Sequence, residues 1–186
     1  MPTWTGTPGS SDLDLQGGAL AYGTEGTNAA LTAGGRMTTP NQPAFSANNS
    51  TSDTNATGDA TQVTVDFDNE IYDIGSNFAA DTFTAPVAGK YEFSVGVAIT
   101  NLSSSHTSLL IDLVTSNREY RLAQVNPYAM QDAASAAYIY ATSVIGVDMD
   151  AADTAYVRII VSGGTKTVTI FGDGSMKTYF TGRLAQ

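Results

Sequence analysis

Hydrophobic and polar residues alternate most regularly in the middle of the chain. From Tyr91 to Ile99 every second residue is large and apolar, whereas the residues between them are small or polar. This period of two is typical of a strand that buries one face in an antiparallel sheet. A shorter alternation at Val63, Val65 and Phe67 predicts another strand of the same kind.

Turn residues divide the rest of the chain into further short apolar runs. They cluster at 101–105, 163–164 and 172–174, where Gly, Asn, Asp and Ser are frequent. Residues 129–137 form either a short helix or a loop. Many short strands separated by turns predict an all-β sandwich or jelly roll. The further predicted strands cover residues 106–115, 118–125, 137–148, 154–162, 166–171 and 177–185.

Two of the predicted strands carry large apolar residues on both faces. They are residues 109–114, with the sequence LLIDLV, and residues 138–147, with the sequence YIYATSVIGV. A strand of a monomeric sandwich buries only one face, so the second apolar face indicates a contact between subunits. Several tyrosines favour the same interpretation, with a sugar- or protein-binding face as the alternative. They are Tyr120, Tyr128, Tyr138, Tyr140, Tyr156 and Tyr179.

Residues 1–41 differ from the rest of the chain. Gly and Thr are frequent there and large apolar residues are isolated, so this segment cannot build a core of its own. We expect an extended arm that packs on a neighbouring subunit or on a carrier, with Trp4, Leu13 and Leu15 as its anchors. A flexible tail is the alternative. Residues 42–186 then form the folded domain.

The composition excludes several classes of function. The net charge of −10 and the lack of any basic run argue against binding to nucleic acids or to anionic membranes. Because the chain has no cysteine, disulfide scaffolds, thiolate zinc sites and cysteine nucleophiles are excluded. The first residues lack the basic start and apolar stretch of a signal peptide, and no apolar run reaches the ~18 residues of a membrane span. We expect synthesis in a host cytoplasm and no membrane anchor.

Candidate catalytic and metal-binding residues are few. His106 is the single histidine and follows three serines, so we interpret it as an ordinary residue of the surface or of a strand edge. Acidic pairs could supply calcium ligands, but we favour solvated strand edges that resist pairing with other sheets. The pairs are Asp12/Asp14, Asp66/Asp68 and Asp148/Asp150. We therefore expect no catalytic residue, no cofactor and no metal, with calcium as the one alternative.

One stretch of the chain resembles a known family signature. Residues 67–95, FDNEIYDIGSNFAADTFTAPVAGKYEFSV, resemble the C1q-like globular domain of the C1q/tumour-necrosis-factor jelly-roll superfamily. The spacing between Phe78 and Phe83 is shorter than in that family, and Val95 stands where an aromatic residue is common. The signature positions are Phe67, Asp73, Phe78, Phe83, Gly89, Tyr91 and Phe93.

Two flanking segments extend the resemblance to most of the chain. Residues 43–47, PAFSA, are similar to the first strand of the family, and residues 179–184, YFTGRL, with Phe180 and Gly182, to its closing strand. The resemblance implies a jelly roll that assembles into homotrimers. It also implies structural roles for the signature, in which Gly89 forms a turn and the aromatic residues fill the core.

The function expected from these features is structural. Residues 35–47, GRMTTPNQPAFSA, are similar to phage virion proteins in which a Gly/Thr-rich arm leads into a jelly roll. We expect a non-enzymatic homotrimer on the surface of a bacteriophage particle, as a capsid decoration, a head fibre or a tail-appendage knob. Residues 1–41 would anchor it to other virion proteins, and the heads would bind a host-surface protein or glycan. A bacterial surface adhesin or lectin-like binding module is the alternative.

Overall fold

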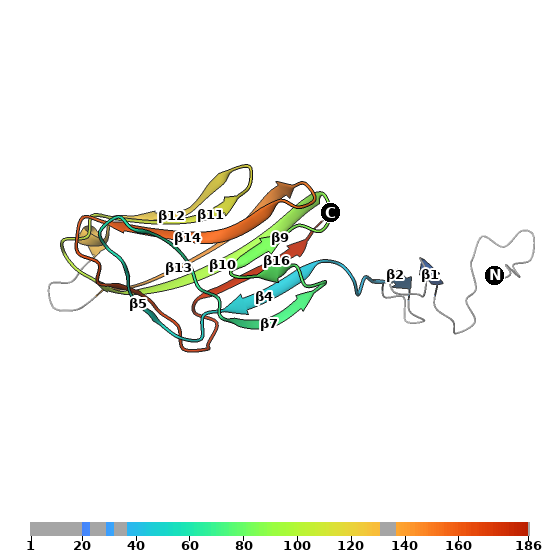
Figure 1. Cartoon of the computed structure of the whole chain (residues 1–186), viewed down its shortest axis with the longest axis horizontal. Helices are drawn as coiled ribbons and strands as arrows, with labels where there is room; N and C mark the ends of the chain where they lie inside the picture. Colours follow the sequence, from blue (N-terminus) through green and yellow to red (C-terminus); the bar gives the residue numbers. More distant parts are fainter. Residues whose placement is uncertain (1–19, 23–28, 32–36, 131–136, 186) are drawn as a thin grey trace, which may run out of the picture. The chain divides into compact units, whose positions relative to one another are not determined.

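Among the residues that the structure describes, β-strands make up nearly all of the regular structure. The computed structural model describes residues 20–22, 29–31, 37–130 and 137–185 (Figure 1). The chain divides into two units, Met1–Gln42 and Pro43–Gln186. A search of the described residues finds no helix with the length and apolar character that a membrane crossing requires.

The first unit contains three short strands, which the sequence analysis did not predict. They are β1 (Leu20–Tyr22), β2 (Ala29–Leu31) and β3 (Met37–Thr38), and they form an antiparallel sheet in the order β1-β2-β3. The proposed anchors Trp4, Leu13 and Leu15 lie outside the described residues, so their role stays a prediction.

The second unit is a sandwich of a seven-stranded and a six-stranded sheet (Figure 1). The seven-stranded sheet contains β4 (Ala44–Asn48), β5 (Asp53–Thr57), β7 (Asn69–Ile74), β10 (Gly89–Leu102), β13 (Ala137–Met149), β15 (Val168–Ile170) and β16 (Tyr179–Leu184). The six-stranded sheet contains β6 (Gln62–Thr64), β8 (Phe78–Ala79), β9 (Thr82–Thr84), β11 (Ser108–Thr115), β12 (Glu119–Val125) and β14 (Thr154–Ser162).

Strand β10 organises the seven-stranded sheet. One of its edges pairs with β13 along most of its length, and the other edge pairs with β16 and then with β15. Strand β16 also pairs with β4, so the first and last strands of this unit lie side by side, with Thr181 opposite Ser46. All of these pairings are antiparallel, as the alternating pattern predicted.

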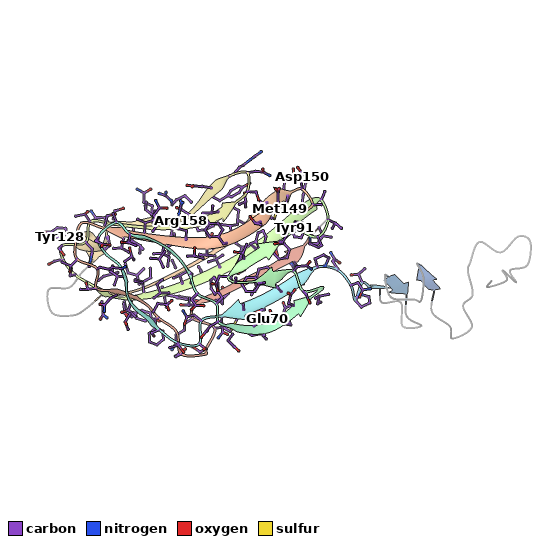
Figure 2. The ribbon with its side chains drawn as sticks, in the orientation of Figure 1. Glu70, Tyr91, Tyr128, Met149, Asp150 and Arg158 are labelled. Carbon is purple, nitrogen blue, oxygen red and sulfur yellow. The ribbon has the colours of Figure 1, made fainter. Side chains whose placement is uncertain are left out.

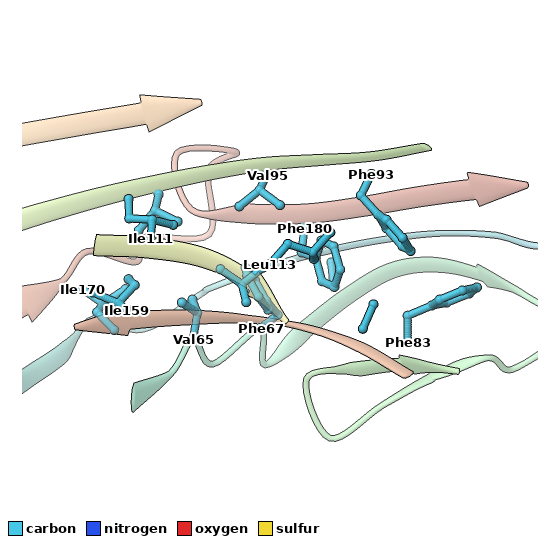
Figure 3. Packing of buried hydrophobic residues seen from close by; sticks show 14 of the residues in the cluster. Val65, Phe67, Phe83, Phe93, Val95, Ile111, Leu113, Ile159, Ile170 and Phe180 are labelled. Atoms are coloured by element: carbon cyan, nitrogen blue, oxygen red, sulfur yellow. The ribbon is translucent and has the colours of Figure 1, made fainter. Parts of the chain in front are cut away.

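The core lies between the inner faces of the two sheets. Phe83, Phe93 and Phe180 belong to a cluster of buried rings, and Leu113 and Ile159 to the aliphatic side chains that continue it (Figure 3). The rings meet in stacked and edge-to-face pairs, such as Phe83 and Phe93 at 5.6 Å between centroids. Such pairs add specific geometry to the burial of apolar area, which fixes how the two sheets face each other.

Two expectations about local structure need correction. Of the possible helix over residues 129–137, the first two residues belong to a 3-10 helix, Pro127–Met130, and the last, Ala137, begins β13. An α-helix is therefore not found at the two ends of this segment, and residues 131–136 lie outside the described residues. Gly89 is the first residue of β10, and it does not have the positive φ seen at glycines such as Gly58. Because extended backbone admits any residue, the expectation that a side chain at Gly89 would be strained is wrong.

A tight hairpin joins β8 and β9. Phe78 lies opposite Phe83, Ala79 lies opposite Thr82, and only Ala80 and Asp81 remain in the loop. Both loop residues have positive φ, 46° at Ala80 and 63° at Asp81, as a type I′ turn requires. Aspartate tolerates this region, and Asp81 also accepts a hydrogen bond from the N–H of Phe67 at 2.7 Å. The side chain of Ala80 makes no hydrogen bond that could offset the steric cost of its positive φ.

Replacing Ala80 with glycine is expected to stabilise the domain by about 0.5–1 kcal/mol, because glycine enters the left-handed region without the steric cost of a Cβ. Denaturant titration measures the gain as a change in the free energy of unfolding. Ala79→Gly is the matched control, since Ala79 is a strand residue of the same hairpin and the same change there should destabilise. Equal effects of the two variants would contradict the assigned turn.

Candidate interaction surface

The residues of the family signature lie inside the sandwich rather than at a surface site. Six aromatic members are buried: Phe67, Phe78, Phe83, Tyr91, Phe93 and Phe180. The Tyr91 hydroxyl donates a hydrogen bond to the carbonyl of Val87 at 2.8 Å, and burial raises the pKa of this phenol. The signature therefore supplies packing, and its one hydroxyl, that of Tyr91, is used in a hydrogen bond inside the domain.

Two of the three polar or small signature residues, Asp73 and Gly182, position the chain. Asp73 on β7 accepts a hydrogen bond from the N–H of Phe78 at 2.8 Å, which ties β7 to the start of β8. Gly182 on β16 leaves room for two rings, because a Cβ there would lie 2.5 Å from the ring of Phe45 and 2.6 Å from that of Phe93. Gly182 is thus required by close approach of the rings.

The outer face of the seven-stranded sheet carries most of the exposed large apolar side chains of this sheet. We call it the tyrosine face and define it by Tyr72, Ile74, Tyr138, Tyr140, Val144 and Tyr179. Val144 is 65% exposed, Tyr138 52% and Tyr140 49%. Exposed aromatic and aliphatic side chains on one sheet face mark an interaction surface, and tyrosine is enriched at such surfaces.

The strand register shapes this face into a shallow hollow. One row across the sheet runs through Val144, Ser94, Thr181, Ser46 and Tyr72, one residue from each of five strands. The side chains at the rims are large and the three between them are small. The hollow has a volume of about 380 Å³. A flat or convex partner surface can therefore rest on the middle strands.

The charges on the tyrosine face cancel, although the protein is acidic overall. Arg183 donates a hydrogen bond to Glu92 at 2.7 Å, and these two residues stand opposite each other on β16 and β10. Lys90 and Asp148, of opposite charge, are neighbours in the β10–β13 register. Charge on this face consequently adds little to the repulsion that a partner surface would meet from a chain of net charge −10.

Aromatic rings crowd the end of the face away from Glu92. The ring of Tyr179 covers Gly96, where a Cβ would lie only 2.2 Å from it. Tyr138 packs edge-on against Phe171 at 6.1 Å between centroids. Burial raises the pKa of the Tyr140 phenol, and its neighbour Tyr179 acts in the same direction. The phenol of Tyr140 is therefore neutral at neutral pH.

The outer face of the six-stranded sheet is different, because charged residues occupy its centre. Asp112 on β11 is 1% exposed and accepts hydrogen bonds from Arg121 and, at 2.9 Å, from Arg158. Figure 2 labels Arg158, which lies on β14. Arg158 also donates to Glu119 at 2.8 Å. The hydrogen bonds to Glu119 and Asp112 raise the pKa of Arg158 further above its ordinary value. Charged residues thus interrupt the second apolar face of residues 109–114, and its role in a subunit contact stays a prediction.

The tyrosines named in the sequence analysis do not all gather on one surface. Tyr138, Tyr140 and Tyr179 belong to the tyrosine face, whereas Tyr128 lies on the 3-10 helix and is 65% exposed. Tyr120 packs partly against the core. Sequence reasoning did not select Tyr72, although it lies in the stretch NEIYDI, where polar and apolar residues are mixed as on an edge strand. Tyr156 is half-buried on β14.

Acidic residues line a second hollow, of about 280 Å³, beside the β8–β9 hairpin. Burial and the charges of Asp81 and Asp68 raise the pKa of Asp66. In contrast, hydrogen bonds from Ser50 to Asp68 lower the pKa of Asp68. A carboxyl whose pKa is higher in the folded than in the unfolded chain destabilises the folded state once the pH rises above the pKa of the unfolded chain. Ionised Asp66 therefore lowers the stability of the domain at neutral pH.

The acidic pairs do not form a recognisable metal site. Calcium takes about 6–8 oxygen ligands. Within the ranges that the structure covers, no three or more acidic or histidine side chains come close enough together to hold a metal ion. Asp148 and Asp150 are exposed, and Asp12 and Asp14 lie outside the described residues. The expectation of no metal, with calcium as the alternative, therefore stays a prediction.

Comparison with known proteins identifies the fold. Residues 44–185 match the family model described as the C1q domain. Among solved structures, the globular domain of zebrafish complement 1qA protein matches with a TM-score of 0.52 and 17% identity, covering 78% of this chain and 98% of that chain. Murine APRIL matches with a TM-score of 0.46 and 14% identity, covering 77% and 98%. No curated protein matches the chain. The predicted all-β jelly roll is therefore confirmed.

Proposed function

This chain belongs to the C1q domain family. We propose that it is a non-enzymatic, homotrimeric structural protein of a virion surface. C1q- and TNF-like domains are typically homotrimeric binding or structural modules and are generally not enzymes. The observation that carries the proposal is the tyrosine face, an exposed, apolar and charge-balanced sheet surface on an otherwise acidic chain.

The tyrosine face supports self-association rather than binding of a small molecule. Its apolar residues Val144 and Tyr72 stand at the two rims of a wide hollow, and Ser94 and Thr181 line the hollow between them. Such a surface offers a large contact area but no deep pocket. In a closed ring of three copies, each face would meet a different surface of the next copy, so no face is left exposed.

Replacing Val144 with aspartate is expected to convert the trimer to monomers at micromolar concentration. The change places an unpaired carboxylate on the most exposed apolar position of the face, where association would bury it at a cost of several kcal/mol. Sedimentation velocity measures the assembly state. Circular dichroism shows whether the β-fold is retained.

Val87→Asp is the matched control for this variant. Val87 is also exposed and apolar, at 46%, but it precedes β10 in a turn rather than on the tyrosine face. We expect Val87→Asp to sediment as the unmodified trimer does. The proposed interface is wrong if the two variants behave alike, or if the unmodified chain is monomeric at micromolar concentration.

The location on a virion is supported by residues 1–47 rather than by the sandwich. A Gly/Thr-rich arm that leads through residues 35–47 into a jelly roll resembles the arrangement in phage structural proteins. In our proposal residues 1–41 anchor the trimer through Trp4, Leu13 and Leu15, and three heads project outward as a decoration, fibre or tail knob. Display of three heads lets weak contacts with a host-surface protein or glycan add to useful avidity.

Purified particles test the virion proposal. We expect mass spectrometry to find the protein in particles banded in a density gradient, and antibody labelling to locate it on their surface. If the protein is instead found on bacterial cell surfaces and is absent from particles, a surface adhesin or lectin-like module is the better assignment.

A further inference from the structure

His106, expected at the surface, is fully buried at one end of the sandwich. Its side chain is 0% exposed, and the sequence analysis was wrong because a serine-rich loop gave no sign of burial. The loop at 103–107 connects β10 to β11, and the loop at 163–167 connects β14 to β15. Each loop passes from one sheet to the other, and the imidazole of His106 lies where the two loops meet.

The hydrogen bonds of the ring fix its protonation state. The backbone N–H of Ser103 donates to Nδ1 of His106 at 2.8 Å. A backbone amide can only donate, so Nδ1 must carry a lone pair. The other nitrogen, Nε2, lies 3.1 Å from the carbonyl oxygen of Thr165 and therefore carries the proton that it donates. The arrangement requires the neutral ring with its hydrogen on Nε2.

Two glycines enclose the ring and hold it in this position. A Cβ on Gly58 would lie 2.9 Å from Nε2 of His106, and a Cβ on Gly164 would lie 2.5 Å from it. The N–H of Gly164 donates to the carbonyl of Gly58 at 3.0 Å, which brings the two glycines together. The ring thus bridges the loop at 103–107, the loop at 163–167 and the turn after β5.

We propose that His106 is a pH-sensitive latch that holds these loops together when neutral and releases them when protonated. A proton on Nδ1 occupies the lone pair that accepts the hydrogen bond from the Ser103 N–H. The Nδ1–H and the Ser103 N–H are then two donors that face each other without an acceptor between them. The Ser103 hydroxyl, 3.1 Å from Nδ1, can accept that proton, but the amide beside it then has no acceptor and faces a cation. A buried cation without a counter-charge adds a further cost.

Neighbouring charges do not compensate for protonation. The loop at 103–107 contains no other titratable residue. Lys166 follows Thr165 in the second loop and Asp59 follows Gly58 in the turn. Both are exposed, and they interact with each other through their opposite charges. Their effects on the ring oppose one another, so the hydrogen bonds and the burial of His106 decide the outcome.

Hydrogen exchange on the full-length chain tests the latch. Histidine is the side chain that changes charge between about pH 5 and 8. Between pH 8 and pH 5 we expect protection in loops 103–107 and 163–167, corrected for intrinsic exchange, to fall by about tenfold or more. Strands such as β10 should keep their protection. Unchanged protection of both loops at the two pH values would overturn the proposal.

Two variants isolate the role of the ring. In His106→Asn the amide oxygen can still accept from Ser103 but does not titrate, so its loops should exchange equally at both pH values. In Lys166→Met the neighbouring charge is lost and the pH response should persist. A pH response in His106→Asn equal to that of the unmodified chain would refute the latch.

A spectroscopic measurement keeps the test valid even if the variant does not fold. The ¹⁵N shifts of the imidazole distinguish the two neutral tautomers. At pH 8 we expect the hydrogen of His106 on Nε2. A hydrogen on Nδ1 would exclude the Ser103 hydrogen bond and, with it, the latch.

Discussion

Replacing Phe180 with alanine is expected to lower the free energy of unfolding by about 3–5 kcal/mol. The ring is fully buried, and its centroid lies 4.9 Å from that of Phe45, 5.5 Å from Phe93 and 5.7 Å from Phe67. Alanine would leave a cavity among these rings, and paired strands on both sides restrict collapse around it. Since domains of this size are stable by only about 5–15 kcal/mol, the variant should be close to unfolding.

Denaturant titration at one fixed protein concentration measures this loss, because the stability of any protein that self-associates depends on concentration. Phe180→Leu is the control, since leucine keeps most of the buried volume and should cost only about 1–1.5 kcal/mol. If the alanine variant loses no more than the leucine variant, the ring cluster does not stabilise the sandwich as the contacts indicate.

Replacing Asp112 with asparagine should have a comparable effect although it changes few atoms. Asp112 is 1% exposed and is the carboxylate shared by Arg121 and Arg158. Removing one partner of a buried ion pair leaves the other charge uncompensated, at a cost of about 3–5 kcal/mol. We expect a loss near the lower limit, because Arg158 keeps Glu119 and the side chain of Arg121 is 41% exposed.

Glu119→Gln provides the comparison on the same arginine. The Glu119 side chain is 59% exposed, so its ion pair with Arg158 is a surface pair worth about 0–1 kcal/mol. Thermal or denaturant unfolding of the two variants should therefore differ by about 2 kcal/mol or more. Similar losses would mean that Asp112 is hydrated in solution and that the network does not depend on its burial.

The sequence predicted the long strands well and the short ones poorly. Period-two patterns identified β10 and the apolar runs that became β13 and β14, because long strands with a buried face show the pattern clearly. Strands such as β5 and β8 have few apolar residues or only a single pair of residues, so their existence depends on neighbouring strands rather than on their own sequence. The local pattern contains no information about those neighbours.

The tyrosine face could be predicted from the sequence of one strand, whereas the buried polar sites could not. Alternation within residues 138–147 correctly indicated an exposed apolar face, because it is a property of one strand. The Asp112–Arg158 pair was missed, although each residue interrupts an apolar run and therefore needed a partner. His106 gave no such signal, since its burial depends on Gly58 and Gly164, which are distant in the sequence.

The adjacency of β4 and β16 has a consequence for synthesis. Strand β16 fills the space between β4 and β10, and a ribosome produces it after every other strand of the sandwich. Before that moment the nascent polypeptide presents two unpaired edges, which are templates for aggregation. A product truncated before Tyr179 cannot cover them. The topology thereby makes closure of the sheet depend on complete translation of the domain, since only polypeptides that include β16 can close it.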